Sequence, residues 1–173
     1  MGKLVIDEWR KNMGMFNFMK SKKGFTQSAP VKGECIPITE VADVAFAEGI
    51  LGKGIAIKPV NGKIYAPADG IVNTVFPTSH AVGISTLDGA EILIHVGLDT
   101  VELRGKFFKS VVTVEQCVHK GELLIEADIE EISKAGYDTV TLMVICNSND
   151  FTRVECKTRG VVEVGEEVIT CIK

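Results

Sequence analysis

The chain has 173 residues, of which 46% are hydrophobic and 24% are charged, and this length and composition predict a single globular domain. Its net charge of −4 excludes a general nucleic-acid binder, because such a protein needs a basic surface to replace the counterions around phosphates. Five scattered cysteines, none spaced for a zinc site, indicate a reducing, cytoplasmic compartment. The sequence lacks a run of about 18 uninterrupted apolar residues, so we expect no transmembrane helix.

The first 30 residues are expected to form an amphipathic or flexible tail ahead of one domain over residues 31–173. Within residues 1–24, six basic side chains outnumber two acidic ones, which gives this segment a charge of +4 and leaves −8 for the remainder. Trp9, Phe16 and Phe18 lie among these charges, and such a mixture suits peripheral contact with an anionic membrane surface. A frayed terminus is the alternative, because Gly14 weakens a helix.

From Val31 onward, short β-type runs alternate with glycine and proline, a pattern typical of an all-β antiparallel sandwich or barrel. A short helix is expected only around residues 129–134, with a turn near residues 40–46. Segments 62–70 and 160–167 are similar enough to suggest a duplicated strand-turn-strand motif. The clearest strand-like runs are GIAIKPV (54–60), EILIHVG (91–97), TVTLMVIC (139–146) and VVEVGEEVITCI (161–172).

Two of the three histidines, His80 and His95, flank a predicted β-hairpin. The β-rich runs on either side of Asp88-Gly89 predict a two-residue turn. This turn places His80 opposite Gly97 and makes His95 its diagonal neighbour on the same sheet face, with Cβ atoms about 7 Å apart. Both imidazoles would then reach one small group. A three-residue loop would instead place the two rings on opposite faces of the sheet.

Two facing imidazoles suit phosphoryl transfer, in which one neutral ring attacks phosphorus and the other donates a hydrogen bond to the phosphoryl oxygens. We expect Thr78 to hydrogen-bond His80, the carbonyl of Gly97 to accept a hydrogen bond from His95, and Asp99 to recognise a basic partner. The Gly-x-Ser-x-Gly pattern is absent, which argues against acyl transfer by a serine triad. A zinc peptidase also lacks its HExxH ligand pattern. Two structural core histidines are the non-functional alternative.

The segments GKGIAIKP (52–59), APADG (66–70), PTSHAVGI (77–84) and EILIHVGLDTVEL (91–103) resemble the glucose-family enzyme IIA of the bacterial sugar phosphotransferase system. The resemblance extends from about Gly33 to the C-terminus and implies a β-sandwich. It implies that His95 accepts phosphate on Nε2 from the histidine-containing phosphocarrier protein and passes it to a cysteine of a IIB domain of a sugar permease. His80 is then the stabilising partner and Thr78 its orienting hydroxyl, while the backbone of Gly97 fixes the Nδ1 side of His95.

The same resemblance implies a partner-binding rim that includes Asp99, Val96 and Lys53. Lys53 departs from the family pattern, because relatives commonly have aspartate at this position, and the change from negative to positive charge alters docking. Phe107 stands where relatives usually have glycine, so we expect the loop around it to differ in shape.

An alternative function is a regulatory binding module that docks on transporters or kinases and is switched when phosphorylation of His95 adds about two negative charges. No cofactor is expected in the isolated chain, although the family resemblance implies that His80 and His95 can share a zinc with a partner's carboxylate. Residues 156–159 resemble the phosphocysteine segment of a IIB domain, but too little chain follows for a second domain. The segment APADGIV (66–72) lacks the hairpin-tip lysine of a biotin or lipoate carrier. The transported sugar is left open.

Overall fold

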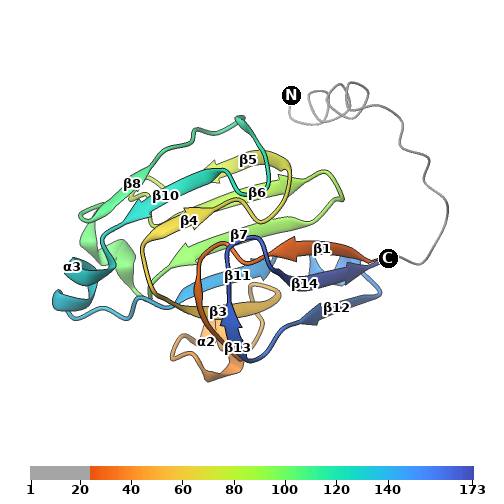
Figure 1. Cartoon of the computed structure of the whole chain (residues 1–173), viewed down its shortest axis with the longest axis horizontal. Helices are drawn as coiled ribbons and strands as arrows, with labels where there is room; N and C mark the ends of the chain where they lie inside the picture. The colour runs from red at the N-terminus through yellow and green to blue at the C-terminus, as the bar shows by residue number, and fades with distance from the viewer. Residues whose placement is uncertain (1–23) are drawn as a thin grey trace.

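The computed structural model describes residues 24–173, which form three antiparallel β-sheets (Figure 1). An eight-stranded sheet has the order β13-β2-β3-β11-β7-β6-β5-β9, and the two three-stranded sheets have the orders β1-β14-β12 and β4-β10-β8. The strands are β1 (Phe25–Ser28), β2 (Gly33–Ile36), β3 (Lys53–Pro59), β4 (Lys63–Tyr65), β5 (Gly70–Val75), β6 (Ala81–Thr86), β7 (Glu91–Val96), β8 (Phe108–Ser110), β9 (Cys117–Val118), β10 (Leu123–Ala127), β11 (Thr141–Ile145), β12 (Arg153–Cys156), β13 (Gly160–Val162) and β14 (Glu167–Ile172).

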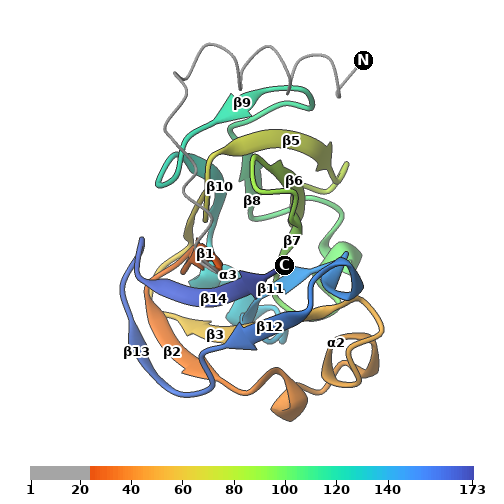
Figure 2. The same ribbon diagram turned by 90° about the vertical axis from the view of Figure 1, so that its right-hand side faces the viewer.

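The helices are short and lie in the connections between strands. They are the α-helices α2 (Val44–Ala47) and α3 (Ile129–Lys134) and the 3₁₀ helices η1 (Ile38–Glu40), η2 (Thr100–Leu103) and η3 (Ser148–Asp150). The predicted all-β antiparallel sandwich with very short helices is therefore confirmed. Figure 2 shows β12 and β14 lying over β3, while β8 and β10 flank the half of the large sheet that contains β5 and β6.

The two faces of the large sheet have different neighbours, and this difference places the functional site. Along β7, the side chains of Ile92, Ile94 and Val96 are buried in the main core between the sheets. Leu93 and His95 alternate with them and so lie on the opposite face. On that face a smaller apolar cluster packs around Leu142 and Phe46. His95 therefore projects from the outer face of the sheet and not into the main core.

Helix α3 begins and ends where local sequence rules place it. The side chain of Asp128 accepts a hydrogen bond from the backbone nitrogen of Glu131 at 3.1 Å, which caps the first turn. Acidic residues occupy the first turn and Lys134 occupies the last, as the helix dipole favours. The helix predicted around residues 129–134 is confirmed, whereas the expected turn near residues 40–46 is η1 followed by α2.

The folded region begins earlier than the sequence analysis expected. Strand β1 lies inside the segment assigned to a tail of 30 residues, and it pairs with β14 from Phe25 opposite Cys171 to Ser28 opposite Glu167. The run FTQS is too short and too polar to be recognised alone, and its pairing with β14 is what makes it a strand. Membrane contact by residues 1–24 falls almost wholly outside the described residues, which begin at residue 24.

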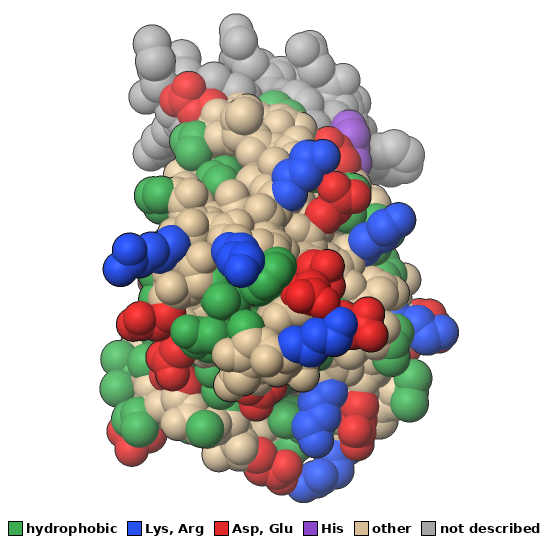
Figure 3. Space-filling model, turned by 90° about the vertical axis from the view of Figure 1, so that its left-hand side faces the viewer, with side chains coloured by type: hydrophobic (Ala, Val, Ile, Leu, Met, Phe, Trp, Pro, Cys, Tyr) green, Lys and Arg blue, Asp and Glu red, His purple; other side chains and the backbone are tan. Residues whose placement is uncertain are grey.

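Among the described residues, no helix combines the length and the apolar character needed to cross a membrane. Figure 3 shows the face that carries α3, on which acidic and basic side chains are interspersed. This mixture on the visible face agrees with the exclusion of a general nucleic-acid binder, which needs a field of one sign.

Candidate active site

The hairpin that carries the two histidines has a longer turn than predicted. Strands β6 and β7 pair with Ala81 opposite His95, and the ladder closes with Thr86 donating its backbone N–H to the carbonyl of Ala90 at 2.9 Å. Three residues, 87–89, therefore form the turn, and the predicted two-residue turn is wrong. The hydroxyl of Thr86 accepts a hydrogen bond from the backbone nitrogen of Ala90 at 3.0 Å, which stabilises this longer loop.

The two imidazoles nevertheless meet, as the sequence analysis predicted. Their ring centroids lie 4.7 Å apart, and the rings are nearly perpendicular at 83°. His80 precedes the first residue of β6, so the regular alternation of side chains along the strand does not govern its direction. The expected proximity is confirmed, but the geometric route to it differs from the predicted one.

The hydrogen bond of His95 determines which of its nitrogens is free. Its Nδ1 lies 2.8 Å from the carbonyl oxygen of Gly97. Because a carbonyl can only accept, Nδ1 carries the proton and Nε2 keeps its lone pair. Gly97 has a φ of +79°, and a Cβ there would lie 2.4 Å from Cγ2 of Thr100. Glycine therefore suits the backbone turn that points this carbonyl back to His95, and the expected hydrogen bond between His95 and Gly97 is present.

His80 is buried, with 3% of its surface exposed, in a largely aromatic setting. Its Nδ1 lies 2.5 Å from the hydroxyl of Thr78, which confirms the expected hydrogen bond. Its ring centroid lies 5.4 Å from that of Phe76 and 6.4 Å from that of Phe108. Burial, and secondarily the neighbouring His95, lower the pKa of His80 to about 4. This imidazole is therefore neutral near pH 7.

His95 is half-buried beside α2, and its ring centroid lies 5.4 Å from that of Phe46. Burial lowers the pKa of His95, while the hydrogen bond to Gly97 and the charges of Asp43 and Asp99 partly oppose this effect. The reactive pair is thus neutral overall, and two carboxylates face it. A neutral imidazole with a free Nε2 is a nucleophile, so the arrangement suits covalent transfer of an electrophilic group.

The sequence analysis did not single out Asp43 and Phe46. Both residues lie about 50 positions before His95 in the chain, and the fold brings them close to it. Asp43 caps α2, where its Oδ1 accepts a hydrogen bond from the nitrogen of Ala45 at 2.8 Å. Asp43 and Asp99 line the same hollow of about 250 Å³. An aspartate before a short helical run is a local signal for a helix cap, but nothing local connects Asp43 with the histidines.

The three residues expected at the partner-binding rim do not lie together in the structure. Asp99 is exposed, beside His95, as expected. The side chain of Val96 is fully buried in the main core, so its predicted contact with a partner is wrong, because strand alternation turns it inward. Lys53 is exposed at the start of β3, three positions before Ala56. In the sheet register, Ala56 pairs with Leu142, and Leu142 pairs with His95, so these three residues form one row across the strands. Lys53 therefore lies about 10 Å along the strand from that row.

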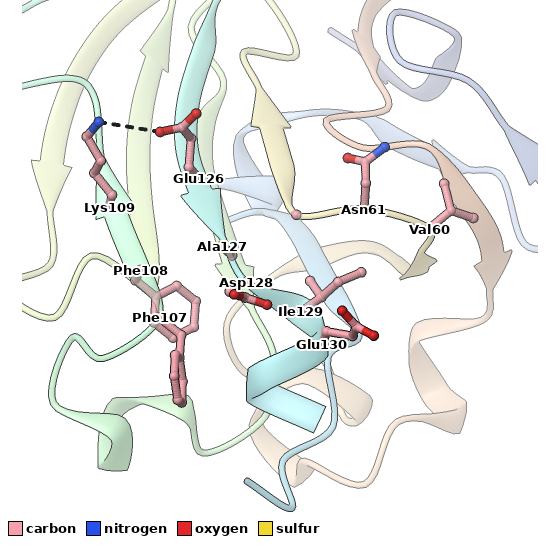
Figure 4. Close-up of a pocket in the computed structure, with 11 residues that line it drawn as sticks. Val60, Asn61, Phe107, Phe108, Lys109, Glu126, Ala127, Asp128, Ile129 and Glu130 are labelled. Atoms are coloured by element: carbon pink, nitrogen blue, oxygen red, sulfur yellow. Dashed lines mark ion pairs between the residues drawn. The ribbon is translucent and has the colours of Figure 1, made fainter. Parts of the chain in front are cut away.

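A hollow of about 710 Å³ (Figure 4) is lined by Phe108, whose ring lies near that of His80, but neither histidine of the pair lines it. Phe107 and Phe108 form one wall, and the loop at Asn61 forms the opposite wall. Lys109 and Glu126 form an ion pair across β8 and β10, with 3.5 Å between Nζ and the carboxylate. The backbone of Phe107 has a φ of +75°, so the loop keeps a conformation that favours glycine although phenylalanine occupies it.

The fold and the site define an antiparallel β-sandwich protein whose candidate reactive centre is a pair of neutral, contacting histidines. Residues 26–151 match the family described as phosphoenolpyruvate-dependent sugar phosphotransferase system, EIIA 1. The chain belongs to this family, which confirms the resemblance noted in the sequence.

Individual relatives agree with this assignment. The chain is 48% identical over 138 residues, 80% of its length, to a PTS system beta-glucoside-specific EIIBCA component from Dickeya chrysanthemi. It is 44% identical over 141 residues, 82% of its length, to a PTS system glucose-specific EIICBA component from Staphylococcus carnosus. The chain spans about a fifth of these relatives, 22% and 21% of their lengths.

A solved structure has the same fold over nearly its whole length. Glucose permease IIA from Mycoplasma capricolum superimposes with a TM-score of 0.78 at 37% sequence identity, covering 90% of this chain and 99% of that one. The match supports the sandwich architecture and the single IIA-type unit independently of the sequence alignment.

Proposed function

We propose that this chain is a phosphocarrier of the sugar phosphotransferase system, in which Nε2 of His95 accepts a phosphoryl group and passes it on. The observation that carries the proposal is the hydrogen bond from Nδ1 of His95 to the carbonyl of Gly97, because it leaves Nε2 as the free nucleophilic nitrogen. The lowered pKa of His95 keeps this nitrogen unprotonated at neutral pH.

The proposed donor is the phosphohistidine of the histidine-containing phosphocarrier protein. A bond forms between Nε2 of His95 and phosphorus while the phosphorus–nitrogen bond of the donor breaks, and the donor imidazole leaves. The proposed acceptor is a cysteine of a IIB domain, and its thiolate displaces His95 from phosphorus in the same way. This partner is supported by the names of the relatives, in which A, B and C components form one protein.

We assign His80 the role of stabilising the transferred group. If the Thr78 hydroxyl donates to Nδ1 of His80, the proton of this neutral ring lies on Nε2, from which it can be donated. A phosphoryl group on His95 would present oxygens beside that donor, because the two rings lie 4.7 Å apart. The charge on those oxygens is what a transfer enzyme must stabilise in a loose transition state.

The negative charges of Asp43 and Asp99 affect the transfer of a phosphoryl group in two ways. Their negative charges beside His95 attract a basic partner surface before transfer. After transfer they repel the phosphoryl group, which favours its onward passage. Val44 follows Asp43 directly and Val101 lies two positions after Asp99. These valines are 60% and 51% exposed and offer apolar contacts for docking.

These same exposed residues favour the second candidate function, regulated docking on a transporter or kinase. Such a partner would bind the apolar and acidic surface around unphosphorylated His95, and about two added negative charges would disrupt the contact. A shared zinc would require a partner, since no group of three or more His, Cys, Asp or Glu residues in the described part of the chain is arranged to hold a metal. The two imidazoles would supply two ligands and the partner the others.

The test is phosphate incorporation from phosphoenolpyruvate in the presence of enzyme I and the histidine-containing carrier, followed by transfer to a IIB domain. The wild type should gain one acid-labile phosphate, His95→Gln none, and His80→Gln should gain phosphate without passing it on. His119→Gln is the matched control, because His119 is an exposed histidine beside Asp69 and outside the site. An unlabelled wild type, or normal labelling of His95→Gln, would contradict the proposal.

A further inference from the structure

The strand register makes the position of the His80 ring unexpected. Ala81 lies opposite His95, and the nitrogen of Val96 donates to the carbonyl of His80 at 2.8 Å. If β6 simply continued backward, His80 would lie opposite Val96, and its side chain would share the buried face of Val96. The His80 ring instead contacts His95, which projects from the other face. His80, immediately before β6, therefore does not follow the regular alternation of the strand.

The backbone of the preceding residue, Ser79, also departs from strand geometry. Ser79 has a φ of +56°, in the left-handed region that non-glycine residues rarely adopt. Its nitrogen donates to the carbonyl of Phe76 at 2.7 Å, and the nitrogen of Phe76 donates to the carbonyl of Ala81 at 3.1 Å. These two bonds close a tight turn over residues 76–81. The regular strand therefore begins only after His80, whose carbonyl still joins the ladder.

The turn also brings the partners of the His80 ring into place. Thr78 and Phe76, which contact this ring, belong to the same six-residue segment. Residues in strained backbone regions persist only when their surroundings determine them, and they concentrate at functional sites. Asp99, Arg104 and Phe107 also have positive φ values, and they lie in the connection between β7, which carries His95, and β8.

We infer that Ser79 is a positioning residue whose left-handed backbone closes the turn that holds Thr78 and Phe76 against the His80 imidazole, and that this turn keeps the His80 ring in contact with His95. The inference rests on the proposed function for its effect on transfer, but its structural content is independent of that function. What matters is the backbone conformation, so residues that accept positive φ should replace serine, and β-branched residues, which resist it, should not.

The experiment compares Ser79→Asn with Ser79→Val, and the matched control is Glu115→Val. Glu115 also has a positive φ, +69°, but it lies in the turn before β9. In Ser79→Asn, nuclear Overhauser contacts between the ring protons of His80 and His95 should persist and phosphate transfer should match the wild type. In Ser79→Val, those contacts should disappear. Onward transfer should fall at least about tenfold, while labelling of His95 changes less, as in His80→Gln.

Glu115→Val should lower the melting temperature and leave both readouts unchanged. If Ser79→Val does not fold, Ser79→Thr supplies a second β-branched side chain that retains the hydroxyl. The inference is overturned if the β-branched variants keep the ring contacts, or if Ser79→Asn loses them. If the wild type accepts no phosphate, the proposed function fails, and the ring contacts alone still support or overturn the role of Ser79.

Discussion

The stability of this protein should depend on pH through the buried imidazole of His80. Its pKa is about 4 in the folded chain, against an ordinary value of 6.5. Below pH 6.5 the unfolded chain binds a proton that the folded chain does not, so acid favours unfolding. The contribution of His80 is therefore fully present above pH 6.5 and is lost as the pH falls from 6.5 toward 4.

The size of the effect follows from the difference between the two pKa values. A shift from 6.5 to about 4 corresponds to about 3 kcal/mol in total, and about 2 kcal/mol of it should disappear between pH 7 and pH 5. Because only 3% of His80 is exposed, solvent screening reduces this figure little. Replacing His80 by glutamine removes the titrating group and keeps an amide beside the Thr78 hydroxyl.

The assay is urea unfolding of the wild type and His80→Gln at pH 7 and at pH 5. The wild type should lose about 2 kcal/mol more than the variant between the two pH values, whatever their absolute stabilities. Nuclear magnetic resonance titration of the His80 ring should give the low pKa directly. Equal losses in the two proteins, together with a ring that titrates at its ordinary pKa, would refute the conclusion that His80 is buried in neutral form.

Substitutions at three further positions test separate parts of the site. Gly97→Ala should destabilise the fold by about 3 kcal/mol in urea unfolding, because its φ is +79° and the new Cβ would meet Thr100 and the carbonyl of Asp138; a stability equal to wild type would contradict the steric argument. Asp43→Asn should preserve the cap of α2 but raise the KM for the phosphodonor in low salt, whereas Asp43→Ala should also cost about 1 kcal/mol of stability; a KM that is insensitive to both charge and salt would exclude Asp43 from docking. Thr78→Val should cost about 2 kcal/mol by leaving Nδ1 of buried His80 without its partner, and should slow onward transfer more than labelling of His95; equal slowing of both steps would argue against a role through His80.

Local patterns in the sequence were sufficient for the fold class and for the two functional contacts that join residues close in the chain. The apolar alternation of β7 is a local property, and so is the spacing of two residues between Thr78 and His80 or between His95 and Gly97. The hairpin turn was predicted wrongly because the loop length depends on the Thr86 side chain, which competes with the two-residue turn favoured by Asp88-Gly89.

The sequence by itself determined that the chain is an all-β domain, because this conclusion depends on short-range periodicity. It also singled out His80 and His95 as the candidate pair, through the small number of histidines and the family resemblance, although the hairpin turn predicted to bring them together is wrong. Only the tertiary structure decided the environment of that pair. Asp43 and Phe46 reach His95 through long-range packing of α2 onto the outer face of the sheet, and Val96 is turned away from partners by strand alternation. The low pKa of His80 likewise arises from burial among aromatic rings contributed by separate segments, because desolvation depends on everything that surrounds a group in space.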